Sequence, residues 1–211
     1  MVESKKYIIE LTNDCNLSCE MCPRQYLKMD IGYMSMDLWL NIIDTIPPNS
    51  TVLPFWRGES TLHPKFESMI KCLDNQNIVL ATNGTNVNPI LNVIDYFSVI
   101  NVSIHNSGSY AGYDVLRNSV TNGRPKVISS MVEGESELVS PDRIYKKHTV
   151  NGKWGRVDGI SGRSIDVNCP CFGEYVVSWD GKRSICHHVW DTSNIFACSD
   201  CSQWEGNGKT L

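Results

Sequence analysis

Three cysteines near the start of the 211-residue chain have a spacing that suits metal or cluster binding. Three residues separate Cys15 from Cys19, and two separate Cys19 from Cys22. Thiolates at such spacings bind tetrahedral zinc or the irons of a [4Fe–4S] cluster. Full ligation of that cluster takes four cysteines, so this loop alone would leave one iron open to a substrate or cofactor. A structural zinc site and an iron–sulfur site are both compatible with the loop.

The residues before these cysteines predict a strand that leads into the loop. Residues 6–12 form a short β-branched and apolar run, and Asn13 and Asp14 are turn formers. Loops at strand ends are where reactive groups usually stand. We therefore expect the cysteines just beyond the end of a first strand.

The CxxxCxxC spacing, with the apolar Met21 before its last cysteine, resembles the signature of radical S-adenosylmethionine (SAM) enzymes. The resemblance implies that SAM chelates the open iron through its amino and carboxylate groups, with Met21 close to this cofactor site. It implies that one electron from the cluster cleaves SAM to a 5′-deoxyadenosyl radical, which abstracts hydrogen from a substrate. An external reductant of the flavodoxin or ferredoxin type would supply that electron.

A Gly58-Glu59 pair follows the second predicted strand, and Leu62-His63-Pro64 comes shortly after it. Taken alone, such a pair is often a turn with a solvated carboxylate. Here it resembles the glycine–glutamate motif of radical SAM enzymes, which implies that Glu59 accepts hydrogen bonds from the SAM ammonium. Arg57 and Ser60 depart from that motif, in which glycine and proline are commoner.

Four further residues resemble positions near SAM in this family. Asn83 belongs to a threonine–asparagine–glycine sequence after the third strand, although Asn-Gly often means only a tight turn. Ser103 and His105 alternate onto one face of a later strand. The family usually has serine-x-aspartate there, so His105 is a departure. Arg117 resembles an arginine that pairs with the SAM carboxylate, and the alternative is a solvated helix arginine.

A second group of cysteines lies near the end of the chain and consists of Cys169, Cys171, Cys186, Cys198 and Cys201. Strand-like runs flank Asp180-Gly181 inside this group, which predicts a β-hairpin. Four thiolates gathered by a hairpin and a CxxC pair would equally suit a zinc ribbon.

The pattern Cys171-x9-Gly181-x4-Cys186, followed by CxxC, resembles the SPASM and twitch extensions of radical SAM enzymes. Cys169 fits the same pattern with a spacer two residues longer. A full SPASM domain needs cysteines after the CxxC pair, and none follows Cys201. The resemblance therefore implies one auxiliary [4Fe–4S] cluster of the twitch type, with either Cys169 or Cys171 not used as a ligand.

Strands and helices alternate along the first part of the chain, which predicts a parallel sheet with right-handed crossovers. The resemblance makes this a partial, open (β/α) barrel of five to six strands, joined to a small cysteine-rich β-hairpin. Gly-rich residues 151–162 suggest a boundary, so we expect a radical SAM core over residues 1–165 and an auxiliary-cluster domain over 166–211. Five strands are expected, around Tyr7, Val52, Ile78 and Ser98 and over residues 126–132, with a sixth near 156–160. Helices are expected over residues 35–43, 66–73 and 90–96.

Composition and charge give no support to several function classes, although they do not exclude a nucleic-acid substrate. With 41% hydrophobic residues, 20% charged residues and a net charge of −4, the chain has no electrostatic signature of nucleic-acid or membrane binding. It has neither an apolar signal segment nor a run long enough to span a membrane, so we expect a cytoplasmic protein. Nine cysteines, an odd number, argue against a pure disulfide framework and favour metal ligation. Cys72 is the exception and is expected to be a small core residue.

The expected function is a net oxidation of a peptide or protein side chain, because a substrate radical beside an auxiliary cluster can pass on an electron. Fourteen residues precede Cys15, so a peptide substrate would need a separate recognition partner or a bare binding surface. The first alternative is dehydrogenation of a small-molecule alcohol, as for aminoglycoside precursors. The second is a non-enzymatic zinc or iron–sulfur module, in which Glu59, Asn83 and Arg117 would share no purpose.

Overall fold

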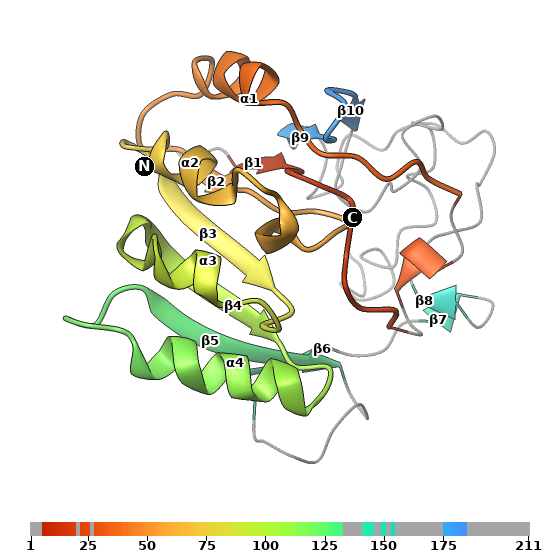
Figure 1. Cartoon of the computed structure of the whole chain (residues 1–211), viewed down its shortest axis with the longest axis vertical. Helices are drawn as coiled ribbons and strands as arrows, with labels where there is room; N and C mark the ends of the chain where they lie inside the picture. The colour runs from red at the N-terminus through yellow and green to blue at the C-terminus, as the bar shows by residue number, and fades with distance from the viewer. Residues whose placement is uncertain are drawn as a thin grey trace, which may run out of the picture.

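The computed structural model describes residues 6–19, 22–25, 28–132, 141–145, 149–150, 153–154 and 175–184. Its main element is an eight-stranded sheet with the strand order β10-β9-β1-β2-β3-β4-β5-β6. The first six strands lie in chain order and are all parallel (Figure 1). The bounds of these six strands are Lys6–Ile9 (β1), Thr51–Leu53 (β2), Asn77–Thr82 (β3), Phe97–Ser103 (β4), Lys126–Val132 (β5) and Arg143–Tyr145 (β6).

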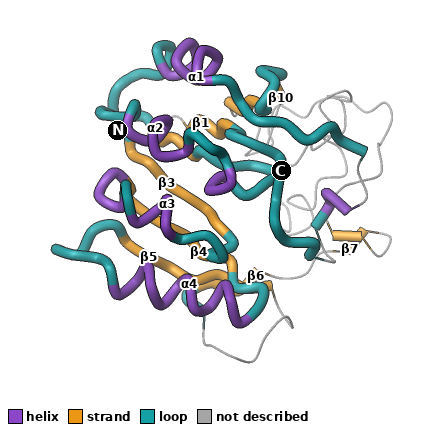
Figure 2. Tube along the Cα trace, in the orientation of Figure 1, coloured by secondary structure: helices purple, strands orange, loops and turns teal. Residues whose placement is uncertain are grey.

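Helices connect the successive parallel strands from β1 to β5, and α2, α3 and α4 lie along one face of the sheet (Figures 1 and 2). Because β6 and β10 end the strand order, the sheet does not close, and the fold is the predicted partial, open (β/α) barrel. The helices are α1 (Met36–Ile43), α2 (Phe66–Lys71), α3 (Asn88–Leu91) and α4 (Ser107–Asn118), with 3₁₀ helices at Pro23–Gln25, Ser60–Leu62 and Ile94–Tyr96.

The predicted helix ends follow from local chemistry. Ser35 precedes α1, and its Oγ accepts a hydrogen bond from the backbone N–H of Leu38 at 3.1 Å. This is the N-cap contact expected from the sequence, since a serine side chain satisfies a donor that the first helical turn leaves unpaired. The segment 90–96, expected to be one helix, is divided between α3 and the 3₁₀ helix Ile94–Tyr96.

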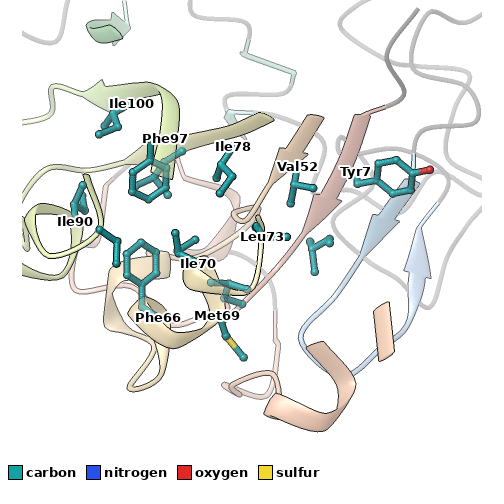
Figure 3. Close-up of a cluster of buried hydrophobic side chains, with 14 of the residues drawn as sticks. Tyr7, Val52, Phe66, Met69, Ile70, Leu73, Ile78, Ile90, Phe97 and Ile100 are labelled. Atoms are coloured by element: carbon teal, nitrogen blue, oxygen red, sulfur yellow. The ribbon is translucent and has the colours of Figure 1, made fainter. Parts of the chain in front are cut away.

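The core lies between the helices and the sheet, where α2 packs against β3 and β4 (Figure 3). Phe66 and Phe97 stack with ring centroids 6.4 Å apart, and Met69, Ile70 and Ile78 are fully buried. Burying one such side chain contributes about 1.5–3 kcal/mol to stability. This packing makes the sheet a rigid base for the loops at its strand ends.

The hairpin predicted around Asp180-Gly181 is confirmed, and its place in the fold was not foreseen. Gly181 has φ of +83°, a conformation that glycine adopts without steric cost. Strands β9 (Tyr175–Val177) and β10 (Arg183–Ser184) pair antiparallel, while β9 also pairs parallel with β1. Pairing with β9 removes the exposed edge that β1 would otherwise present. The hairpin therefore extends the sheet, and the division of the chain near residue 165 stays a prediction.

The later predictions are only partly covered by the described residues. The sixth parallel strand is β6, whereas the strand expected near 156–160 lies outside the described residues. Within the Gly-rich boundary, Lys153–Trp154 (β8) pairs antiparallel with Thr149–Val150 (β7). Across the described ranges, no helix is both long and apolar enough to cross a membrane.

Candidate functional site

The carboxyl ends of β1, β2 and β3 bring three predicted motifs together. The cysteine loop (residues 15–22) follows β1, Gly58 and Glu59 follow β2, and Asn83 immediately follows β3. Since neighbouring parallel strands end at the same edge of a sheet, these motifs meet there. This edge is where open α/β sheets generally bind their ligands.

Glu59 is a buried carboxylate, only 2% exposed, that is held by four hydrogen bonds. Its Oε1 accepts hydrogen bonds from the backbone N–H of Thr61 at 3.2 Å and from the Thr61 hydroxyl at 2.8 Å. The same oxygen accepts from the Thr82 hydroxyl at 3.0 Å, and Oε2 accepts from the backbone N–H of Asn83 at 2.7 Å. Burial raises the pKa of Glu59 above its ordinary value, against the effect of these donors. In the part of the chain that the structure describes, no cation pairs with this carboxylate. A bound ligand cation would therefore find a preoriented anion.

Gly58 lets the glutamate segment lie directly against the start of the cysteine loop. A Cβ at this position would be 2.4 Å from the carbonyl oxygen of Asp14 and 2.5 Å from that of Thr12, which is closer than real Cβ contacts. The next backbone N–H, that of Glu59, donates to the same Asp14 carbonyl at 2.7 Å. The pair is thus more than a solvated turn, because its glycine permits the contact and its glutamate is buried.

Asn83 links Glu59 to the cysteine loop. While its backbone N–H contacts Glu59, its Nδ2 donates to Oδ1 of Asn16 at 2.9 Å and lies 3.8 Å from Sγ of Cys15. Its Oδ1 accepts from the backbone N–H and Oγ1 of Thr85 at 2.9 and 2.6 Å, and Nδ2 of Asn16 donates to Oγ1 of Thr85 at 2.7 Å. These contacts fix the amide with its nitrogen toward the cysteine.

Helix α4 supports the turn that carries Asn83. Gly84 has φ of +72°, and a Cβ added at Gly112 of α4 would lie 1.8 Å from the carbonyl oxygen of Gly84. Only a glycine at position 112 allows the helix backbone to approach the turn so closely. The position of Asn83 therefore depends on helix packing as well as on the strand that precedes it.

Residues 11–14 and 30–34 lie side by side and close the base of the cysteine loop. Thr12 Oγ1 donates to the carbonyl of Gly32 at 2.7 Å, and the backbone N–H of Gly32 donates to Oδ1 of the buried Asn13 at 2.9 Å. Asp14 continues the contact, since its Oδ1 accepts from the backbone N–H of Cys15 at 2.8 Å and its Oδ2 from the hydroxyl of Tyr33 at 2.6 Å. These contacts hold the segment that precedes Cys15 against the segment that follows the cysteine loop. We call residues 11–14 and 30–34 the clamped base.

Cys15, Cys19 and Cys22 are unbridged and partly buried. The backbone N–H of Cys22 donates to the carbonyl of Cys19 at 2.9 Å, and burial raises the pKa of the Cys15 and Cys22 thiols. No three histidine, cysteine or acidic side chains within the described ranges already stand close enough to form a metal site. Three cysteines on one clamped loop fit a cluster as donors, and cluster binding would have to draw their sulfur atoms together and displace their protons.

His63 is a site residue whose role the sequence did not predict. It is 5% exposed, its Nε2 donates to the carbonyl of Met34 at 2.9 Å, and its Nδ1 accepts from the backbone N–H of Lys65 at 3.0 Å. Burial lowers its pKa below 6.5, which favours the neutral ring that this pattern requires. His63 thereby ties the glutamate segment to the second half of the clamped base. The Leu62-His63-Pro64 resemblance singled out the residue without giving this function.

The departure at Arg57 has a structural explanation. Its guanidinium forms a buried ion pair with Glu10, with Nη2 donating to Oε2 at 2.6 Å and Nε donating to Oε1 at 2.8 Å. A glycine here would leave the Glu10 carboxylate buried without its cation, which is strongly unfavourable. The two residues are 47 positions apart, so their pairing could be predicted only from the arrangement of the strands that carry them.

The remaining predicted site residues are less directly connected. Ser103 ends β4 and His105 lies two residues beyond it, both partly buried, at the same edge of the sheet. Arg117 is exposed on α4 and donates to the hydroxyl of Tyr113 at 3.0 Å, a contact that does not join it to Glu59. Cys72 caps the end of α2 and is only partly buried, so it is not the core residue expected. Met21 and the second cysteine group, Cys169, Cys171, Cys186, Cys198 and Cys201, lie outside the described residues, and their roles stay predictions.

Comparison with known proteins links the chain to a sequence relative and to a solved structure. No protein-family model matches the chain. Over 86 residues it is 38% identical to the tungsten-containing aldehyde ferredoxin oxidoreductase cofactor-modifying protein of Pyrococcus furiosus, a match that covers 38% of this chain and 24% of that protein. The chain thus spans about a quarter of that relative.

The structural neighbour is BtrN, crystallised in complex with AdoMet and 2-DOIA. The superposition has a TM-score of 0.57 and 16% sequence identity, and it covers 90% of this chain and 75% of the BtrN chain. At that identity the likeness establishes a shared fold. The partial, open (β/α) barrel described above is therefore also the fold of a protein that binds AdoMet.

Proposed function

We propose that this chain is a radical SAM enzyme, in which Cys15, Cys19 and Cys22 hold a [4Fe–4S] cluster and Glu59 receives the ammonium group of SAM. The observation that carries the proposal is the continuous contact from Glu59 through Asn83 to Cys15. It brings a buried carboxylate that has no cationic partner among the described residues next to a three-cysteine loop, at the edge of the sheet where ligands generally bind. A fold shared with an AdoMet-bound protein supports the same assignment.

The chain's own residues would bind and orient SAM. Glu59 would offer its charge to the ammonium group, and the donors from Thr61, Thr82 and Asn83 favour the ionised form against the effect of burial and fix the direction of the carboxylate. Gly58 holds this carboxylate against the base of the cysteine loop. When bound, the cluster supplies the electron that breaks the sulfur–C5′ bond of SAM, which yields methionine and a 5′-deoxyadenosyl radical.

A zinc-binding module accounts for fewer of these contacts. Zinc would need the cysteines, but it would give no purpose to a buried carboxylate that pairs with no cation in the described part of the chain, or to an asparagine amide that faces Cys15. Such groups cost stability when they are buried and are retained where they serve a ligand or a unique structure. We therefore favour the radical SAM enzyme over the zinc-binding module as the function of this chain.

We further propose a net two-electron oxidation of the substrate. The 5′-deoxyadenosyl radical would take one hydrogen atom and become 5′-deoxyadenosine, and the substrate radical would then lose a proton and pass its remaining electron to the predicted auxiliary cluster. Of the two candidate reactions, we favour dehydrogenation of a small molecule over modification of a peptide side chain. BtrN was crystallised with the small molecule 2-DOIA, and the Pyrococcus relative is named for modifying a cofactor. The auxiliary cluster, the external flavodoxin- or ferredoxin-type reductant and the peptide alternative stay predictions from the sequence.

Anaerobic reconstitution with iron and sulfide, followed by SAM and dithionite, tests the proposal. We expect about eight irons per chain and formation of 5′-deoxyadenosine, and about four irons with no 5′-deoxyadenosine when Cys15, Cys19 and Cys22 are all replaced by alanine. Tightly bound zinc, no cluster and intact SAM would reject the enzyme. Faster 5′-deoxyadenosine formation with 2-DOIA and related small molecules than with peptides would support the small-molecule substrate, and the reverse would restore the peptide.

A further inference from the structure

Three segments that are distant in the sequence meet at one buried carboxylate. Glu10 lies directly after β1, is completely buried, and receives two side-chain hydrogen bonds from Arg57 at 2.8 and 2.6 Å. The backbone N–H of Arg57 also donates to Oε1 at 3.2 Å, and the backbone N–H of Trp179 donates to Oε2 at 3.2 Å. We call Glu10, Arg57 and Trp179 the hairpin junction. It joins the strand before the cysteine loop, the segment before Glu59 and the β9–β10 hairpin.

The hairpin junction also reaches the chain beyond the cysteine loop. Nη1 of Arg57 donates to Sδ of Met29 at 3.6 Å, and its guanidinium lies 4.2 Å from the ring centroid of Trp56. The contacts of Arg57 therefore extend from the strand before the cysteines to the residues after them. A side chain with these contacts restrains both sides of the loop.

The indole of Trp179 packs directly on the clamped base. A Cβ added at Gly32 would be 2.3 Å from the Trp179 ring, so the ring covers the backbone of Gly32. That backbone is held by Thr12 and Asn13 from the other half of the base. Trp179 thus closes the base from the side of the C-terminal hairpin.

We infer that the β9–β10 hairpin, through the hairpin junction, positions the cysteine loop, so that SAM binding at the first cysteine group depends on Trp179. The inference rests on the proposed function. A buried ion pair is a poor source of stability compared with apolar packing of the same volume. Its hydrogen bonds are directional and connect three segments, so they specify one arrangement of those segments. Apolar contacts would specify that arrangement less strictly. The residues of the hairpin junction are positioning residues, because their hydrogen bonds to one another and to Met29 fix the segments that carry the cysteines and Glu59.

Thiol alkylation of the cluster-free chain measures loop position without any cofactor. In Trp179→Ala we expect Cys15 to react with iodoacetamide at least about fivefold faster than in the unmodified chain, since the base of its loop loses its cover. Cys72, at the end of α2, serves as the internal reference and should keep its rate. Mass spectrometry of the digested chain reads both cysteines in one sample. Trp179→Phe should restore the slow rate of Cys15, because a smaller aromatic ring still covers Gly32.

The reconstituted chain then tests the link to SAM. Trp179→Ala should weaken SAM binding about tenfold. It should also change the electron paramagnetic resonance signal that the reduced cluster shows when SAM is added. In Trp179→Phe, both the affinity and the signal should stay close to those of the unmodified chain. Lys182→Ala is the matched control on the same hairpin, since its side chain is 66% exposed and forms its ion pair with Asp180, while its interactions with Asp30 and Arg57 are only electrostatic. It should leave SAM affinity unchanged.

Complementary substitutions test the contact between ring and glycine. Gly32→Ala should weaken SAM binding, because its methyl group displaces the indole, and Gly32→Ala combined with Trp179→Ala should bind SAM better than Gly32→Ala alone. If Trp179→Ala increases the alkylation rate of Cys72 as much as that of Cys15, the single variant has unfolded. The comparison of Gly32→Ala with the double variant then tests the inference. The inference is overturned if the double variant shows no recovery, or if a folded Trp179→Ala binds SAM as the unmodified chain does. A failure of the unmodified chain to bind SAM would instead reject the proposed function.

Discussion

The side-chain amide nitrogen of Asn83 lies 3.8 Å from the sulfur of Cys15. Asn16 and Thr85 fix the orientation of this amide, so the N–H rather than the carbonyl faces the cysteine. At the same time the backbone N–H of Asn83 donates to Glu59. One residue at the end of β3 therefore contacts both the proposed cluster ligand and the proposed SAM ligand, which makes it the first target for mutation.

Asn83→Leu should lower the midpoint potential of the reconstituted cluster by about 20–60 mV, the equivalent of one hydrogen bond to a ligand sulfur. The loss of the donor leaves the more negative, reduced cluster less stabilised. A redox titration followed by electron paramagnetic resonance measures the shift. Asn92→Leu is the control, because Asn92 is exposed and its Nδ2 donates to Oε1 of Glu67 at 2.9 Å. An unchanged potential in Asn83→Leu would show that the amide does not act on Cys15.

Glu59→Gln should weaken SAM binding about 10- to 100-fold, since a charge-assisted hydrogen bond is replaced by a neutral one and the new amide faces donors. In the unmodified chain, SAM affinity should decrease as the pH falls through the pKa of Glu59, which burial raises above 4.5. Protonation removes the negative charge that attracts the ammonium group. Equilibrium dialysis with labelled SAM over this pH range measures both effects. A pH-independent affinity that is equal in both proteins would contradict the assignment of Glu59.

His63 should make the stability of the chain depend on pH below about 6.5. Burial lowers the pKa of His63 in the folded state, so between the folded and unfolded pKa values the unfolded chain binds more protons. Stability is therefore complete above about 6.5 and is lost as the pH falls toward the lower, folded pKa. Urea unfolding of the unmodified chain and of His63→Gln, at several pH values, measures the slope. The glutamine variant should have a shallower slope, and equal slopes would assign the effect to another group.

Arg57→Met should lower the free energy of unfolding by about 3–5 kcal/mol, because it leaves the Glu10 carboxylate buried without its cation. The double variant Glu10→Leu, Arg57→Met should be more stable than Arg57→Met, since it removes the unpaired charge as well. Chemical denaturation of the three proteins tests this order. A double variant that is less stable than Arg57→Met would mean that the ion pair is not the source of the loss.

Gly112→Ala should both destabilise the chain by about 1–3 kcal/mol and weaken SAM binding, because the added methyl group displaces the turn that carries Asn83. Gly108→Ala in the same helix is the control, since its added Cβ would meet side-chain atoms alone, Oδ1 of Asn106 at 3.2 Å and Cγ2 of Thr85 at 4.0 Å. Thermal unfolding and SAM titration should separate the two variants. Equal effects would indicate a general loss of α4 rather than a displaced turn.

Much of the fold followed from local patterns in the sequence. The first five strands, the Ser35 cap and the Asp180-Gly181 turn all depend on residues within a few positions of one another. Neighbouring side chains and backbone dihedrals determine such features, so a sequence window contains the needed information. Order and direction of the parallel strands followed from the same alternation, because short crossovers place successive strands side by side.

The environment of the candidate site could be predicted only in part. Cys15, Cys19 and Cys22 stand on one loop, and Gly58-Glu59 and Asn83 stand at strand ends, as their positions in the sequence indicated. That Glu59 is buried and that Asn83 faces Cys15 depends on how β2 and β3 lie beside β1. Burial and orientation of this kind are set by packing between elements, which a linear pattern does not specify.

The sequence by itself determined which residues have the chemistry: the cysteine spacing, the glutamate after the second strand, and the turn that leads to Asn83. Only the tertiary structure decided that Glu10 pairs with Arg57, and that the backbone N–H of Trp179, 169 residues later in the chain, donates to the same carboxylate. The physical reason is that an ion pair or a strand pairing between distant segments forms only after the chain has folded. Its partners are selected by topology and burial, and no local preference in the sequence distinguishes Glu10 from an exposed glutamate.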